Sequence, residues 1–292
     1  MFFYAPAMTS IESNRSALTK ESAFRIFKAL IFLILMINLF YYLLEDVTAY
    51  LYLAPGSTLF DVLESFAVTI DYVAWMVLIV LFEMETSAQA RDQLVGTRKW
   101  VIAGLTVGCY VVLVYAAYGY AAGLGDAYNF APIESETVCE LTDGHFAYLN
   151  TQARPIELTK HNCAVIEESE VFKSPTDNLI ATHFNLLALQ KLAWIDVINS
   201  NAWLLVVLLF QIEVSLQLAK KLTKRRLIAT KAAKGIAYLA LLGCAIYWTV
   251  YSAFIDSWDA WLWLLAFLLI DLNLLGLNES QNQRASRDVV AG

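Results

Sequence analysis

The chain has 292 residues, of which 59% are apolar and only 16% are charged. The apolar residues come in runs of about 20, which is the length that crosses a hydrocarbon core of about 30 Å. This pattern excludes an ordinary soluble domain and indicates a polytopic membrane protein. The formal net charge of -7 does not indicate a nucleic-acid-binding protein, because such proteins carry large basic surfaces.

The apolar runs predict six membrane-spanning helices, at residues 29–49, 68–90, 99–121, 197–219, 235–255 and 257–277. Residues 1–28 and 278–292 then form terminal segments, and residues 124–190 form a long connection between two helical regions, 29–123 and 191–277. We therefore expect an all-α fold of six spanning helices.

The distribution of basic residues predicts the orientation. If the N-terminus is cytoplasmic, the inner segments hold 16 of the 20 Lys and Arg residues. Only Arg154, Lys160, Lys173 and Lys191 then lie outside. An excess of basic residues in cytoplasmic segments is the usual rule, so we expect a multi-pass protein of the cell (inner or plasma) membrane with both termini inside.

The connection at residues 124–190 is predicted to be an acidic subdomain outside the membrane. It contains Cys139 and Cys163, which we expect to form a disulfide, because an outer compartment is oxidising. Closing a loop of about 25 residues contributes about 3 kcal/mol in a loop-entropy model.

Three helices carry a similar pattern of residues, which indicates an internal repeat. An Ala-Trp pair ends at Trp75, Trp203 and Trp261, and a carboxylate follows ten positions later, at Glu85, Glu213 and Asp271. Each marked helix is the returning helix of a pair that enters from the cytoplasm. We therefore expect three helix hairpins related by a pseudo-threefold repeat.

The three carboxylates should lie about 15 Å below their tryptophans, in the inner third of the membrane. A charge within the bilayer costs about 2.5 to 3.5 kcal/mol at the centre, so each carboxylate should have a partner. One interpretation is structural: Lys28 would pair with Glu85, Lys99 with Glu213 and Lys234 with Asp271.

The alternative interpretation is a path for cations. Here Glu85, Glu213 and Asp271 would form an acidic ring, because such rings select cations in channels. Phe82, Phe210 and Leu268, one helical turn above, would form an apolar constriction. Glu83 would add a further acidic group to the polar part of the path, and Asp71 would attract cations at its outer entrance.

A basic run between the fourth and fifth helices is a candidate lipid-binding segment. It includes Lys220, Lys221, Lys224, Arg225 and Arg226. Near a membrane surface each basic residue gains about 1 kcal/mol from anionic lipid head groups. The same run also satisfies the orientation rule without binding any specific lipid.

The sequence predicts no metal site and no cofactor. The three histidines lie in the outer connection at spacings that match no ligand motif, and no nucleophile or dinucleotide motif is present. We therefore expect a protein that is not an enzyme.

Two functions fit these patterns. The first is conduction or transport of a small cation, including H⁺, past the carboxylates within the membrane, alone or as a homo-oligomer. The second is a non-catalytic accessory, scaffold or sensory subunit of a membrane complex, which binds a partner through its acidic outer subdomain. In both cases the expected partners are membrane lipids, and nucleic acid is not expected.

Overall fold

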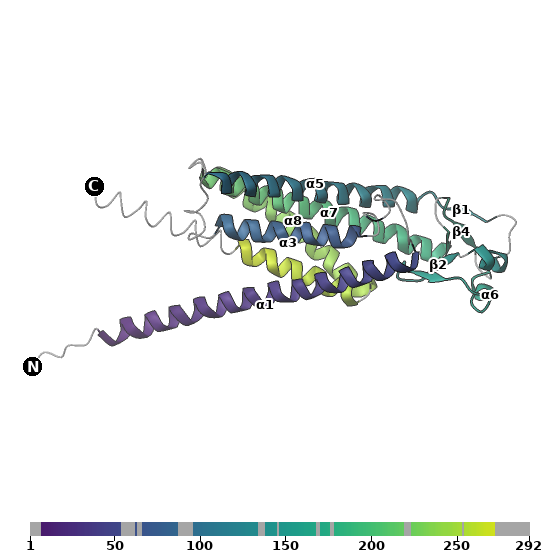
Figure 1. Cartoon of the computed structure of the whole chain (residues 1–292), viewed down its shortest axis with the longest axis horizontal. Helices are drawn as coiled ribbons and strands as arrows, with labels where there is room; N and C mark the ends of the chain where they lie inside the picture. Colours follow the sequence, from purple (N-terminus) through teal and green to yellow (C-terminus); the bar gives the residue numbers. More distant parts are fainter. Residues whose placement is uncertain are drawn as a thin grey trace, which may run out of the picture. The chain divides into compact units, whose positions relative to one another are not determined.

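The structure is a computed structural model, and it describes residues 7–53, 62, 66–86, 96–133, 138–144, 146–167, 170–175, 178–218, 223–252 and 254–271. The described chain is mostly helical (Figure 1). It divides into two compact units, Met1–Lys99 with Trp261–Gly292, and Trp100–Ala260.

Among the described residues, five helices are long and apolar enough to cross a membrane. They are α1 (Ala7–Leu53), α3 (Ala67–Thr86), α5 (Thr97–Ala127), α7 (His183–Leu218) and α8 (Lys224–Tyr251). A further apolar helix covers residues 254–271 and overlaps the sixth predicted span, residues 257–277. The multi-pass membrane character is thus supported, while the membrane orientation and the repeat stay predictions.

In the first unit, α1 and α3 pack as an antiparallel pair. Lys28 near the start of the apolar part of α1 meets Glu83 at the end of α3, and Asp46 near the end of α1 meets Thr69 at the start of α3. This pair agrees with the first predicted hairpin. Residues 261–271 pack on α3 through aromatic contacts, such as Tyr72 with Trp263 at 5.1 Å between ring centroids.

In the second unit, α7 and α8 form the most extensive helix pair. The pair is antiparallel, because Glu213 near the end of α7 meets Lys234 early in α8, and Ile195 on α7 meets Cys244 further along α8. Helix α8 begins at an N-cap, where the Thr223 hydroxyl accepts a hydrogen bond from the Arg226 amide at 3.4 Å. The α7–α8 pair joins the fourth and fifth predicted spans, which belong to different predicted hairpins. The hairpin of the third and fourth predicted spans stays a prediction.

Between α5 and α7 lies a small folded domain, residues 131–182, which we call the outer domain after the location that the sequence predicts for it. It holds β1 (Ala131–Pro132), the 3-10 helix η1 (Val138–Gly144), β2 (Ala147–Leu149), β3 (Pro155–Glu157), α6 (Cys163–Glu167), β4 (Val171–Lys173) and β5 (Leu179–Thr182). The strands form one sheet in the order β1-β4-β5-β2-β3, in which only β2 and β5 run parallel. The all-α prediction is therefore incomplete, because these strands of two to four residues are too short to produce a periodic pattern in the sequence.

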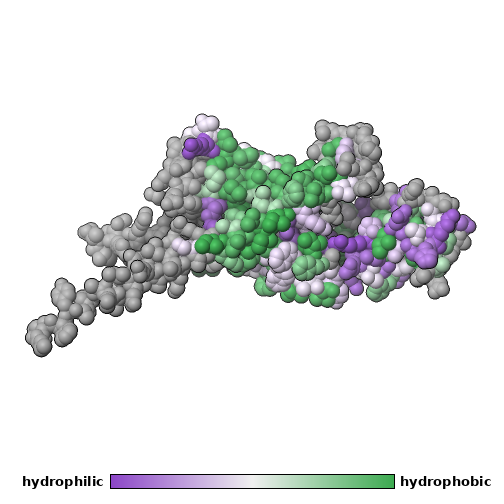
Figure 2. Space-filling view, turned by 60° about the horizontal axis from the view of Figure 1, so that its bottom comes forward, coloured by the Kyte–Doolittle hydropathy of each residue, from purple (hydrophilic) through white to green (hydrophobic). Residues whose placement is uncertain are grey.

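The outer domain has its own core, which the predicted disulfide supports. Val138, Phe146, Val171 and Ile180 are among its buried residues. Cys139 and Cys163 are joined by a disulfide, with their Cα atoms 5.1 Å apart, so the expected bridge is confirmed. On the face shown in Figure 2, apolar side chains gather over the helical region and hydrophilic ones over the outer domain.

Candidate functional site

The first candidate site is an ion pair within the α1–α3 hairpin. The Lys28 ammonium lies 2.6 Å from a carboxylate oxygen of Glu83, and the two side chains are 15% and 29% exposed. The predicted partner was Glu85, two residues further along α3. Residues two apart on a helix point about 200° away from each other, so a lysine on a neighbouring helix meets only one of them. The side chain of Glu85 lies outside the described residues.

The second candidate site is the pair formed by Glu213 on α7 and Lys234 on α8. Their charged atoms are 2.8 Å apart, and the two side chains are only 1% and 3% exposed. The Lys234 ammonium also lies 4.5 Å from the centre of the Phe210 ring. A cation over an aromatic face is attracted by the ring quadrupole, and the attraction grows when water is excluded.

The structural interpretation of the sequence paired Glu213 with Lys99 and Lys234 with Asp271. The structure instead brings Glu213 and Lys234 to each other, and the pairings with Lys99 and Asp271 stay predictions. Only residues 219–223 separate α7 from α8, so the two helices turn back on each other and bring Glu213 to Lys234. The side chain of Lys99 lies outside the described residues, and Asp271 is half-buried in the first unit.

These contacts pair Glu83 and Glu213 each with a lysine. An isolated charge at this depth is costly, whereas a paired and buried one is tolerated as long as neither partner is lost. The geometry therefore fits the structural interpretation of Glu83 and Glu213. A ring of Glu85, Glu213 and Asp271 would draw on both units, and it stays a prediction.

The predicted constriction is only partly matched by the burial of its members. Phe82 and Phe210 are 1% and 0% exposed, but Leu268 is 49% exposed. The buried face of the last helix instead carries Trp263 and Phe267, and Phe267 packs against Trp75 at 5.9 Å between ring centroids. The third copy of the pattern thus presents a different face from the one its spacing predicted.

The structure also contains a helix cap that the sequence did not reveal. The buried carboxylate of Asp46 on α1 accepts a hydrogen bond from the Thr69 amide at 3.0 Å. Thr69 is in the first turn of α3, where backbone amides have no partner in their own helix, and a negative charge there is favoured by the helix dipole. No local motif marks such a cap, because its two halves are 23 positions apart. Asp71, the predicted entrance residue, is half-buried in the same helix.

The basic run is described only from Lys224 onward. Lys224, Arg225 and Arg226 are exposed in the first turn of α8, while Lys220 and Lys221 lie outside the described residues. Positive charges at the start of a helix are opposed by its dipole, so external anions such as lipid phosphates would stabilise them. Lipid binding by this segment stays a prediction.

The outer domain is joined to the membrane helices without a flexible linker. Strand β5 ends at Thr182 and α7 begins at His183. In the first turn of α7, the Asn185 side-chain amide donates to the Leu149 carbonyl of β2 at 2.7 Å. Further along, the Gln190 amide donates to the Ala127 carbonyl at the end of α5 at 3.1 Å. Sheet, α5 and α7 are therefore fixed to one another.

The histidines do not form a site in the described part of the chain. His183 stacks at a tilt on Phe172, with ring centroids 5.8 Å apart, and His161 is exposed. Among the described residues, no three His, Cys, Asp or Glu side chains gather as metal ligands would.

Comparisons with known proteins do not add to this description. No protein-family model, curated protein or solved structure matches the chain.

Proposed function

We propose that this protein is a non-catalytic accessory or sensory subunit of a membrane complex, and that its outer domain binds a partner outside the membrane. The observation that carries this proposal is the direct continuation of β5 into α7. A folded domain built onto the end of a spanning helix holds its binding surface at a fixed height and angle above the membrane.

The charge of the outer segment suggests the chemistry of the partner. Residues 124–190 hold ten Asp and Glu against three Lys and Arg. Of these acids, Asp126, Glu140, Glu157 and Glu170 are described and exposed. A surface of one sign attracts a partner of the opposite sign and speeds their encounter, so the partner should present a basic face.

The pairing of the glutamates supports this choice over transport. Glu213 is buried against Lys234, and Glu83 is bound to Lys28. A carboxylate held by a lysine has its charge already compensated, so neither residue offers a vacant site to a passing cation in this conformation.

The proposal is tested by isolating the protein in mild detergent from the membranes in which it occurs and measuring its mass by native mass spectrometry. We expect a complex of defined stoichiometry. The double variant Glu157→Lys and Glu170→Lys should dissociate it, whereas Lys224→Glu, at the opposite end of the helices, should leave it intact. A protein that is always recovered alone, or a complex that survives both outer substitutions, would contradict the proposal.

Cation transport is the second candidate. Glu213 and Lys234 compensate each other in this conformation, but their position within apolar helices favours transport, because ionisable residues within membrane helices often mark ion pathways. The test is flux of H⁺, Na⁺ and K⁺ into liposomes that contain the purified protein. Flux that disappears in folded Glu85→Gln plus Glu213→Gln protein would support transport. No flux above that of empty liposomes would exclude it.

A further inference from the structure

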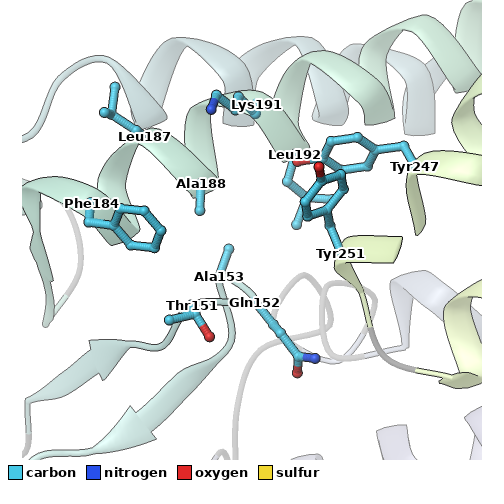
Figure 3. A pocket seen from close by; sticks show the side chains of 10 residues that line it. All are labelled: Thr151, Gln152, Ala153, Phe184, Leu187, Ala188, Lys191, Leu192, Tyr247 and Tyr251. Carbon is cyan, nitrogen blue, oxygen red and sulfur yellow. The ribbon is translucent and has the colours of Figure 1, made fainter. Parts of the chain in front are cut away.

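A small cavity lies in the second unit where the outer domain meets the membrane helices. Its volume is about 260 Å³. Residues 151–153 of the turn between β2 and β3 form one wall, the first turns of α7 form the opposite wall, and two tyrosines of α8 close one side (Figure 3). The three walls come from segments that are far apart in the sequence.

The turn that forms the first wall is held in place by several polar contacts. The Asn150 side-chain oxygen accepts from the amides of Gln152 and Arg154, both at 2.9 Å. Ala153 has a positive φ of 56°, a conformation that a non-glycine residue keeps only where its surroundings fix it. The Arg154 guanidinium donates to both oxygens of Asp256, at 3.0 and 3.2 Å. These contacts indicate a preformed cavity, as is usual for ligand sites.

The lining is apolar apart from a few polar groups. Phe184, Ala188 and Leu192 of α7 face the turn, and the rings of Tyr247 and Tyr251 lie 4.9 Å apart on α8. Lys191, at the edge of the cavity, is the single charged residue among the ten that line it. The nearby Asp256 is already compensated by Arg154 and also accepts a hydrogen bond from Ser252 at 2.6 Å, so Lys191 is the charged side chain that a ligand in the cavity would contact.

The position of the cavity along α8 points to a molecule of the membrane surface. Tyr251 is the last residue of α8, and tyrosines are enriched where helices leave the hydrocarbon region. Ile246 and Val250, each one position before a lining tyrosine, are 50% and 64% exposed. An apolar helix surface that is fit to face lipid therefore adjoins the cavity.

We propose that this cavity binds an amphipathic molecule with one anionic head group, a phosphate diester or a carboxylate, and a hydrocarbon chain. Lys191 holds the head group, and the first part of the chain lies against Phe184, Leu192 and the two tyrosines. Pockets for drug-sized ligands measure about 300 to 1,000 Å³, so this smaller cavity encloses only one end of the molecule and the rest of the chain lies along α8. This site does not depend on the protein partner proposed above.

The test uses the purified full-length protein in a neutral detergent, with binding measured by native mass spectrometry and by titration of tyrosine fluorescence. The probes are dioleoyl phosphatidylglycerol, sodium oleate and, as a neutral reference, dioleoyl phosphatidylcholine. We expect saturable 1:1 binding of an anionic probe. A preference for phosphatidylglycerol identifies a phospholipid as the ligand, and a preference for oleate identifies a free fatty acid.

Two variants and a control locate the binding. Lys191→Gln should weaken binding at least about tenfold, which is the size expected for a lost charge-assisted hydrogen bond. Ala188→Phe should abolish it by filling the cavity. Lys160→Gln, an exposed lysine of the outer domain that does not line the cavity, should leave it unchanged.

Three results would overturn the proposal: no saturable binding of either anionic probe, equal binding of phosphatidylcholine, or equal losses in Lys191→Gln and Lys160→Gln. If Ala188→Phe does not fold, the comparison of Lys191→Gln with Lys160→Gln still shows whether the probe binds in the cavity. The measurement needs no partner protein, so its failure would leave the proposed accessory role untouched.

Discussion

Two lysine–glutamate pairs each join the helices of an antiparallel pair in this protein, and they differ in how far water reaches them. Lys28 and Glu83 are 15% and 29% exposed, whereas Lys234 and Glu213 are 3% and 1% exposed. The second pair also has the Phe210 ring beneath its ammonium group. The same two residue types thus occupy two environments. The stability lost when one partner is removed should depend on how buried the pair is, and not on the distance between its charged atoms.

The largest effect is expected for Glu213→Gln. The substitution leaves the Lys234 charge buried without its counter-ion, which costs about 3 to 5 kcal/mol. We expect a lower midpoint of thermal unfolding in detergent and a smaller yield of monodisperse protein. Glu140→Gln, an exposed acid of the outer domain, is the control and should change neither quantity.

A smaller loss is expected for Phe210→Leu. The substitution keeps an apolar side chain but removes the aromatic face under Lys234, and a desolvated cation–π contact contributes about 2 kcal/mol. The thermal midpoint should fall by less than in Glu213→Gln. Phe82→Leu is the matched comparison, since Phe82 is equally buried, and an equal loss at both sites would show that packing alone is responsible.

Glu83→Gln should cost less, about 1 kcal/mol, because water partly solvates Lys28 after its partner is lost. Screening provides a second measurement. Raising the salt concentration should reduce the difference in unfolding free energy between Glu83→Gln and the parent protein. It should not change the difference in unfolding free energy between Glu213→Gln and the parent protein. An equal salt response of the two variants would contradict the difference in burial.

The smallest effect is expected when both charges of the buried pair are removed together. In Lys234→Met plus Glu213→Leu, no uncompensated charge remains, and such replacements are often neutral or stabilising. Stability should return close to that of the parent protein. A double variant as unstable as Glu213→Gln would mean that the site needs its charges for a reason other than mutual compensation.

The sequence predicted the features that depend on composition over long segments. Runs of about 20 apolar residues placed the helices, and the compartment argument placed the Cys139–Cys163 disulfide. It also identified Glu213 and Lys234 as residues that need partners, because a charge within a membrane helix is costly wherever the helix packs.

The features that depend on how elements pack could not be predicted. The choice between Glu83 and Glu85 as the partner of Lys28 is set by the rotation of α3, which one sequence does not specify. The exposed position of Leu268 has the same origin. Strands as short as Val171–Lys173 carry no periodic signal, and the cavity beside Lys191 combines segments that no spacing rule relates.

Because strand β5 ends at Thr182 and α7 begins at His183, a rotation of the sheet also rotates α7. Its 36 residues extend about 54 Å at 1.5 Å per residue. A tilt of about 5° imposed on the sheet by a bound molecule would carry the far end of the rod sideways by about 5 Å over that length. Glu213 lies near that far end, so a tilt of the sheet would displace Glu213 relative to Lys234 on α8.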